Sequence, residues 1–145
     1  MKKPFDYVGT HHCEAAVLSC IDFRFWQTID EYVKTHLGIA SYDFPSLPGA
    51  AKAINDSEGD LAMSCITIPC QLHNAHKLII VNHADCGAYG GAKQHADIEA
   101  EQEFHAAELR KARAKVLDKH PDKEVILLFA KLVDEGQTIH IVVID

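Results

Sequence analysis

The sequence predicts an α/β protein whose mostly parallel central sheet is covered by helices on both faces. Short apolar runs that do not alternate with polar residues recur along the chain, as expected of strands buried on both sides. Longer stretches with helical spacing of apolar residues separate these runs, which is the pattern of βαβ units. The 145 residues contain no internal repeat or low-complexity tract, and their number suits one core. We therefore expect residues 1–145 to form a single domain.

The first predicted strand covers residues 15–20 (AAVLSC), an apolar run typical of a buried strand. A helix follows, because apolar residues between Phe25 and Leu37 recur at three- and four-residue spacings, and Gly38 is a natural stop. Residues 39–44 predict a second strand, which ends in a loop with two prolines.

The middle of the chain predicts two further helices and the clearest strand. Residues 57–75 are interpreted as a helix that Ser57 caps, and Pro69 is expected to kink or interrupt it. Residues 77–82 (KLIIVN) form the clearest strand. The polar, alanine-rich residues 92–120 predict a long helix that the next proline closes.

Two final strands are predicted at residues 125–130 and 139–144. The loop between them contains Asp134, Glu135 and Gly136 and is short enough for a hairpin. A hairpin would make the final strand antiparallel to its neighbour.

The composition narrows the functional classes. The formal net charge is −7 and the pI is about 5.7; an acidic surface repels phosphate backbones, so we expect no nucleic-acid partner. No apolar run approaches the length of a membrane span, so we expect no membrane partner. The basic opening residues turn polar again at Asp6, without an apolar run of signal length. We therefore expect a cytoplasmic protein.

Three side chains of metal-ligand type follow two of the predicted strands. Cys20 ends the first strand, while His83 and Cys86 come directly after the strand at 77–82. Ligand sites of open parallel sheets lie beyond the carboxyl ends of the strands, so these side chains converge if the two strands are neighbours. Two thiolates and one imidazole suit zinc, and three protein ligands leave one position open, as in catalytic sites. The sequence therefore predicts one Zn²⁺ at this edge.

Asp22 and Arg24 lie beside this predicted zinc site. An Arg–carboxylate pair two residues apart, just past the end of a strand, could hold the carboxylate ionised and in a fixed direction. The free carboxylate oxygen could then orient a water on the metal, whose pKa zinc lowers to about 7. Such a pair can also be merely a structural ion pair. Next to three metal ligands we favour the functional role.

The motifs C-x-D-x-R and H-x-x-C-G, some sixty residues apart, resemble the zinc-site signature of the β-class carbonic anhydrases. The chain looks like a small, minimal-length member, and Cys20, Asp22, Arg24, His83 and Cys86 match the signature position by position. The resemblance implies a zinc lyase that reversibly hydrates carbon dioxide to bicarbonate. It implies Asp22 and Arg24 as the catalytic residues, and it also implies a homodimer or higher homo-oligomer.

The chain departs from the family pattern after the second strand. Many members have an Arg and an Ala-Gly-Asn-like turn there, whereas this chain reads FPSLPGAA and keeps only Gly49. Phe23, Phe25 and Trp26 add aromatic bulk that could narrow the substrate channel. Two alternatives therefore stay open: a hydrolase of carbonyl sulfide or carbon disulfide on the same scaffold, and a zinc-binding regulatory protein without turnover. Against the second, every residue that the chemistry needs is present.

The remaining cysteines and histidines have simpler explanations. Three cysteines are expected to be packed apolar side chains: Cys13, Cys65 and Cys70. His11 and His12 flank Cys13, and a second metal site there is conceivable, but an exposed N-terminal segment is the simpler interpretation. Three histidines are expected on the exposed face of the long helix: His95, His105 and His120.

Overall fold

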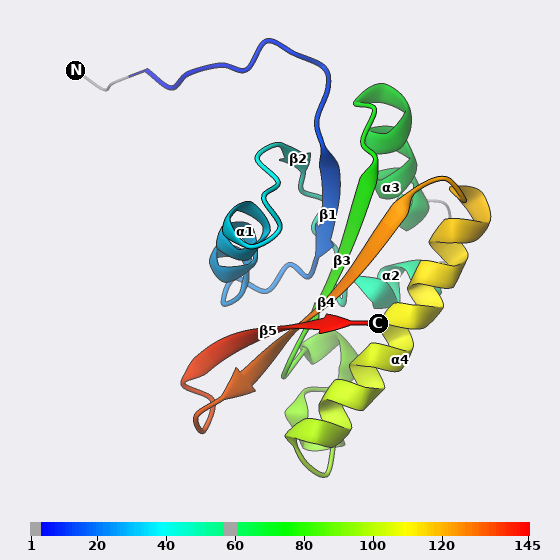
Figure 1. Ribbon diagram of the computed structural model, residues 1–145. Helices are drawn as coiled ribbons and strands as arrows, with labels where there is room; N and C mark the ends of the chain where they lie inside the picture. Colours follow the sequence, from blue (N-terminus) through cyan, green and yellow to red (C-terminus); the bar gives the residue numbers. More distant parts are fainter. Residues whose placement is uncertain (1–3, 57–60) are drawn as a thin grey trace.

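The computed structural model describes residues 4–56 and 61–145 and contains a five-stranded sheet in the order β2-β1-β3-β4-β5 (Figure 1). β1 pairs in parallel with β2 and β3, and β3 pairs in parallel with β4, whereas β5 runs antiparallel to β4. The predicted fold, with its antiparallel last strand, is confirmed. The strands are β1 (Ala15–Ser19), β2 (Tyr42–Asp43), β3 (Lys77–His83), β4 (Glu124–Val133) and β5 (Thr138–Ile144).

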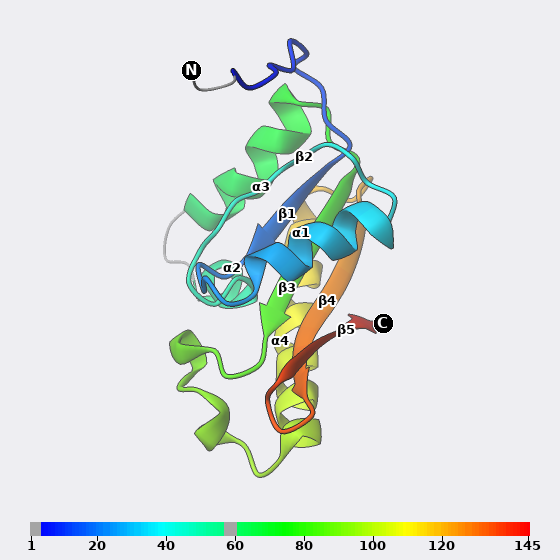
Figure 2. The same ribbon diagram turned by 90° about the vertical axis from the view of Figure 1, so that its left-hand side faces the viewer.

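Helices cover both faces of the sheet, as Figures 1 and 2 show. One face carries α1, which buries Ile29 and Val33 against the strands. The other face carries the remaining three helices. Within the described residues, no helix combines the length and apolar character that crossing a membrane requires. The helices are α1 (Trp26–Thr35), α2 (Ala51–Asn55), α3 (Leu61–Leu72) and α4 (Ile98–Lys119).

β1 explains why the apolar runs of this chain do not alternate. Val17 points into the core under α1, while Ala16 and Leu18 point into the core on the opposite face. All three residues are fully buried. Since successive side chains of a strand point to opposite faces, a strand covered on both sides must be apolar throughout.

Local signals determine where two helices end or begin. α1 ends before Gly38, whose φ of +67° is the left-handed conformation that glycine adopts without strain. α4 begins at Ile98, because the Asp97 side chain accepts a hydrogen bond of 2.7 Å from the Ala100 N–H. The expectation of a helix from residue 92 is therefore wrong at its start, and residues 92–94 form a 3₁₀ turn instead.

The structure differs from prediction most between β1 and β3. The strand expected at 39–44 is reduced to Tyr42 and Asp43, because the Ile39 N–H donates to the Val33 carbonyl at the end of α1 instead of joining a ladder. The short helix α2 was not predicted. Its five residues are too few to show a helical period.

The helix expected at residues 57–75 is present as α3, and Ser57, its predicted cap, lies outside the described residues. Pro69 does not interrupt α3, contrary to one of the two expectations for it. Proline removes its own N–H bond and crowds the carbonyl four residues earlier, yet the turn after it still forms, because the His73 N–H donates to the Pro69 carbonyl at 3.1 Å. The helix stops before Asn74, which has a φ of +55°.

Candidate metal centre

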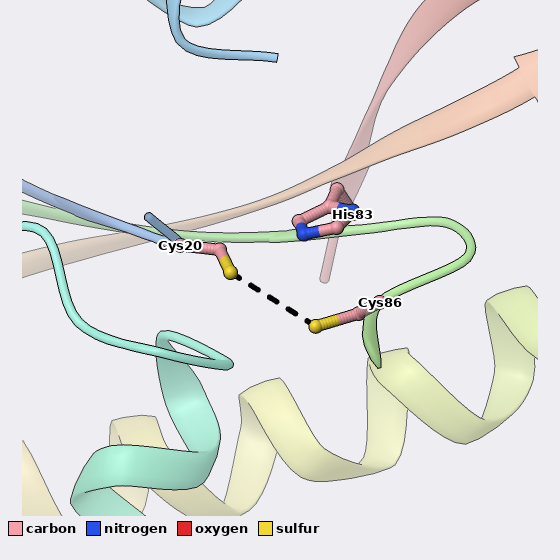
Figure 3. Close-up of side chains that lie close together, drawn as sticks. All are labelled: Cys20, His83 and Cys86. Carbon is pink, nitrogen blue, oxygen red and sulfur yellow. Dashed lines mark hydrogen bonds between the residues drawn. The ribbon is translucent and has the colours of Figure 1, made fainter. Parts of the chain in front are cut away.

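The fold brings the three predicted ligand side chains together at the carboxyl ends of β1 and β3. Cys20 follows β1 directly, His83 is the last residue of β3, and Cys86 lies in the turn beyond it. The parallel pairing of β1 with β3 places these chain segments side by side. The two sulfur atoms lie 4.0 Å apart, and one potential ligand atom from each residue lies within 4.8 Å of the others. Figure 3 shows the two thiols facing each other beside the His83 ring.

His83 presents one ring nitrogen to this cluster. Its Nδ1–H donates a hydrogen bond of 2.7 Å to the carbonyl of Ala84, which leaves the lone pair on Nε2. The side chain is 2% exposed, and Nε2 has no hydrogen-bond partner among the described residues. The Phe25 ring stacks on the imidazole with 4.2 Å between ring centroids. A buried nitrogen without a partner is costly, and a metal ion would satisfy it.

The two thiols are buried and share one hydrogen bond. The hydrogen bond from Cys86 lowers the pKa of Cys20, and the Gly49 N–H, 3.4 Å from the Cys20 sulfur, acts in the same direction. The same bond to Cys20 raises the pKa of Cys86. The shared hydrogen bond favours one negative charge on the pair, and a cation would favour the thiolate form of both sulfurs. Sulfur and imidazole donors of this kind fit a borderline-soft metal ion.

Gly49 is the residue that lets the loop after β2 approach the thiols. Its φ is +75°, and a Cβ built there would lie 2.8 Å from Cβ of Lys52 and 3.2 Å from Cβ of Ala88. No other residue type fits without displacing the backbone of α2 or of the loop after β3. The structure thus explains why position 49 is a glycine. The Arg and Asn of the family turn have no counterpart in this loop.

Asp22 and Arg24 form the predicted ion pair beside the thiols. Nε of Arg24 lies 2.9 Å and 3.1 Å from the two Asp22 carboxylate oxygens, and Nη2 lies 2.6 Å from Oδ2. These hydrogen bonds lower the pKa of Asp22 to about 2, so the carboxylate is charged at neutral pH. Oδ2 of Asp22 also lies 3.8 Å from Nε2 of His83, which places the carboxylate at the edge of the ligand cluster.

Asp85 is a second partner of Arg24 that the sequence interpretation missed. Nη1 of Arg24 lies 3.2 Å from the Asp85 carboxylate, and Nη2 lies 3.3 Å from its carbonyl. Asp85 has a φ of +52°, and its N–H donates a 2.7 Å hydrogen bond to the buried carboxylate of Glu101. The sequence signal that could have indicated Asp85 is its position inside the H-x-x-C-G motif, because a loop residue between two ligands lies next to the site.

His105 contradicts its predicted position. It was expected on the exposed face of the long helix, but it is 1% exposed and its Nδ1 lies 3.0 Å from Nδ2 of Asn82. Burial lowers its pKa to about 4, so it is neutral at pH 7. His95 is also misplaced, because it precedes α4. Cys70 is buried in the core, as expected, whereas Cys65 is only partly buried, and Cys13 is partly buried and contacts Asp43.

A mostly apolar cavity of about 430 Å³ adjoins Cys20. Its walls come from the turn after β1 and the loops after β2 and β3. The exposed side chains of Ile21 and Phe23 stand at its mouth, 61% and 82% exposed. A small uncharged molecule could therefore reach the ligand cluster. The lining residues are Cys20, Ile21, Asp22, Phe23, Pro48, Gly87 and Ala88.

Comparison with known families and structures gives a consistent result. Residues 10–143 match the family described as "Putative carbonic anhydrase". Among solved structures, the fold is similar to the crystal structure of β-carbonic anhydrase isoform I from Trichomonas vaginalis, with a TM-score of 0.61. That match covers 98% of this chain and 87% of the other, at 11% sequence identity, and therefore speaks for the fold alone.

Two relatives come from Rickettsia, and both are described as uncharacterized proteins. The protein of Rickettsia conorii is 38% identical over 117 residues, which cover 75% of this chain and 62% of the relative. The protein of Rickettsia bellii is 33% identical over 117 residues, which cover 75% of this chain and 71% of the relative. The chain thus spans less than two thirds of the length of the R. conorii protein.

Proposed function

Because this chain belongs to the family described as "Putative carbonic anhydrase", as its two motifs predicted, we propose that it reversibly hydrates carbon dioxide with a zinc ion held by Cys20, His83 and Cys86. The observation that carries the proposal is the convergence, within 4.8 Å, of two buried thiols and an imidazole nitrogen that has no hydrogen-bond partner in the described part of the chain. Three ligands of these types leave a fourth zinc position for solvent. When bound, zinc would lower the pKa of that solvent molecule to about 7 and so supply a nucleophile at neutral pH.

Asp22 would hold the nucleophile-forming solvent in one orientation by accepting a hydrogen bond from it at Oδ2. Its position supports this role, because Oδ2 lies 3.8 Å from Nε2 of His83. The fork of Arg24 occupies one side of both carboxylate oxygens. The backbone N–H and Nε–H of Arg24 donate to Oδ1 and its Nη2–H donates to Oδ2, so of the roughly four acceptor positions of an ionised carboxylate one, on Oδ2, is left for the site. Arg24 therefore keeps Asp22 ionised and fixes its direction.

The apolar cavity would bind the substrate. Carbon dioxide is small and has no net charge, so it gains little from charged walls and can lie against Ile21, Pro48 and Ala88. Carbonyl sulfide shares this linear, weakly polar form, and the cavity supports it as a second candidate substrate. The ionised Asp22 at the edge would disfavour retention of an anionic product, because like charges repel.

Oxygen-18 exchange between labelled carbon dioxide and water tests the proposal on purified, zinc-loaded chain. We expect exchange far above the buffer rate, and no acceleration from Cys86→Ala, which removes one ligand. Cys65→Ala, a half-buried cysteine of α3, is the matched control and should keep wild-type exchange. Sulfide release from carbonyl sulfide is measured on the same sample. Sulfide release without oxygen exchange would replace carbon dioxide by carbonyl sulfide as the proposed substrate. If the zinc-loaded chain catalysed neither reaction, the enzymatic role would be contradicted.

A further inference from the structure

A second group of metal-ligand side chains lies at the opposite end of β1. Cys13 precedes β1, Asp43 ends β2 and His73 follows α3, and one potential ligand atom from each lies within 4.8 Å of the others. Strands rise about 3.3 Å per residue, so the stretch from Cys13 to Cys20 separates the two clusters by roughly 20 Å. The cluster is therefore independent of the proposed active site.

Backbone hydrogen bonds hold these three positions without help from the side chains. The Cys13 N–H donates to the His73 carbonyl at 2.9 Å, which fixes the start of β1 against the end of α3. Asp43 pairs with Ala16 in the parallel ladder between β1 and β2. The Glu14 N–H donates to the Ser41 carbonyl at 3.0 Å, which ties the same two segments again. A preorganised set of ligands of this kind loses little entropy when it binds an ion.

The side-chain atoms already face one another. Nδ1 of His73 lies 2.5 Å from Oδ2 of Asp43, and the Cys13 sulfur lies 3.9 Å from the same oxygen. In a tetrahedral zinc site with bonds of about 2.0–2.3 Å, neighbouring ligand atoms lie roughly 3.3–3.6 Å apart. Small side-chain rotations would therefore open the His73–Asp43 pair and close the distance to sulfur. Thiolate, imidazole and carboxylate are the three ligand types that zinc takes in proteins.

The cluster borders a cavity of about 420 Å³ that is lined partly by the segment before β1. The His11 ring lies in this lining, 6.3 Å from the His73 ring between centroids, so a second imidazole is close to the fourth position. His73 and Asp43 are each about one third exposed, at 34% and 33% of their side chains. An ion can thus reach the ligands from solvent.

We propose that Cys13, Asp43 and His73 bind one Zn²⁺ ion, which fastens the segment before β1 to β2 and to the end of α3. Binding releases the thiol proton of Cys13 to solvent and moves the remaining proton of a neutral His73 to Nε2. Zinc at this site is structural, because it crosslinks three segments that are distant in sequence. The simpler explanation is an ordinary His73–Asp43 ion pair with a packed thiol beside it, and it predicts no bound ion.

Equilibrium dialysis of the full chain against Zn²⁺, with metal analysis, tests this site independently of the active site. We expect two zinc ions per wild-type chain, one in Cys86→Ala, one in His73→Ala, and none in the double variant of these two. His76→Ala, an exposed histidine in the same turn as His73, is the matched control and should keep two. Cys13→Ser should also bind one zinc ion per chain. Agreement between the two variants would show that the lost ion does not result from a folding defect of one of them.

Cobalt substitution separates the two sites by their spectra. Thiolate-to-cobalt charge-transfer absorption should persist in Cys86→Ala, from Cys13 alone, and disappear when Cys13→Ser is added. Absence of a bound ion in Cys86→Ala, or two ions retained by both His73→Ala and Cys13→Ser, would overturn the proposal. Failure of the active-site proposal is a different result: the ion held through Cys13 would remain, and carbon dioxide exchange would be missing.

Discussion

Replacing Asp22 by Asn tests the ion pair at the proposed active site, because the change removes one charge and keeps the shape. Arg24 lowers the pKa of Asp22 from 3.8 to about 2, and this shift corresponds to about 2 kcal/mol of stability at neutral pH. The Asp22 side chain is 16% exposed but Arg24 is 42% exposed, so solvent screening reduces the value. We expect Asp22→Asn to lower the free energy of unfolding by about 1–2 kcal/mol at pH 7.

The sign of the pH dependence follows from the lowered pKa. The wild type keeps this contribution above about pH 4 and loses it as the pH falls toward about 2, whereas Asp22→Asn should lack that loss. Urea unfolding at a series of pH values measures both effects. Asp56→Asn is the control: its ion pair with Lys52 is exposed to solvent, so no resolvable change in the free energy of unfolding is expected.

Activity gives the second readout of the same variant. Loss of a residue that orients a metal-bound group typically costs about 10–100-fold in activity. We expect Asp22→Asn to fall by that factor in kcat/KM for carbon dioxide while its zinc content stays unchanged. Wild-type turnover by Asp22→Asn at full zinc content would refute the orienting role of Asp22, whatever its effect on stability.

Three further perturbations examine the surroundings of the site. Phe25→Ala removes the ring stacked on His83 and should cost about 3–5 kcal/mol in urea unfolding; a cost below 1 kcal/mol would show that the ring is not packed there. Because burial lowers the pKa of His105 to about 4, stability should fall by up to about 3 kcal/mol as the pH drops from about 6.5 to 4, and His105→Gln should flatten this slope. If His105→Gln left this pH dependence unchanged, a group other than His105 would take up the proton. Asp97→Ala removes the cap of α4 and should cost about 1 kcal/mol in thermal unfolding; no change in Tm would argue against that cap.

The strands at the centre of the sheet were predictable because burial on both faces leaves a local signature. β1 is apolar from Ala15 to Leu18 and β3 from Leu78 to Val81; Cys20 follows the first strand directly, and His83 ends the second. The chemistry of Cys20, His83 and Cys86 could therefore be placed at one sheet edge without coordinates. Their convergence within 4.8 Å agrees with that inference from the topology.

Features that depend on distant contacts could not be predicted in the same way. His105 belongs to a polar, alanine-rich helix, and only the packing of α4 on the sheet decides which of its faces is buried. Asp85 pairs with Arg24 across 61 residues, and Asp43 meets His73 across 30. Such pairs depend on the order of the strands in the sheet, and the spacing of apolar residues along the sequence does not predict that order. The five residues of α2 were too few to be recognised.

Stopped-flow hydration of carbon dioxide, with zinc content determined on the same sample, tests the proposed function most directly. The wild type and Cys86→Ala are compared across pH values from about 7 to 9, where a zinc-bound water is expected to ionise. We predict hydration well above the buffer rate for the wild type, and loss of both the activity and one zinc ion per chain for Cys86→Ala. Hydration at the buffer rate by a fully zinc-loaded wild type, or undiminished hydration by Cys86→Ala, would contradict a zinc-dependent anhydrase at this site.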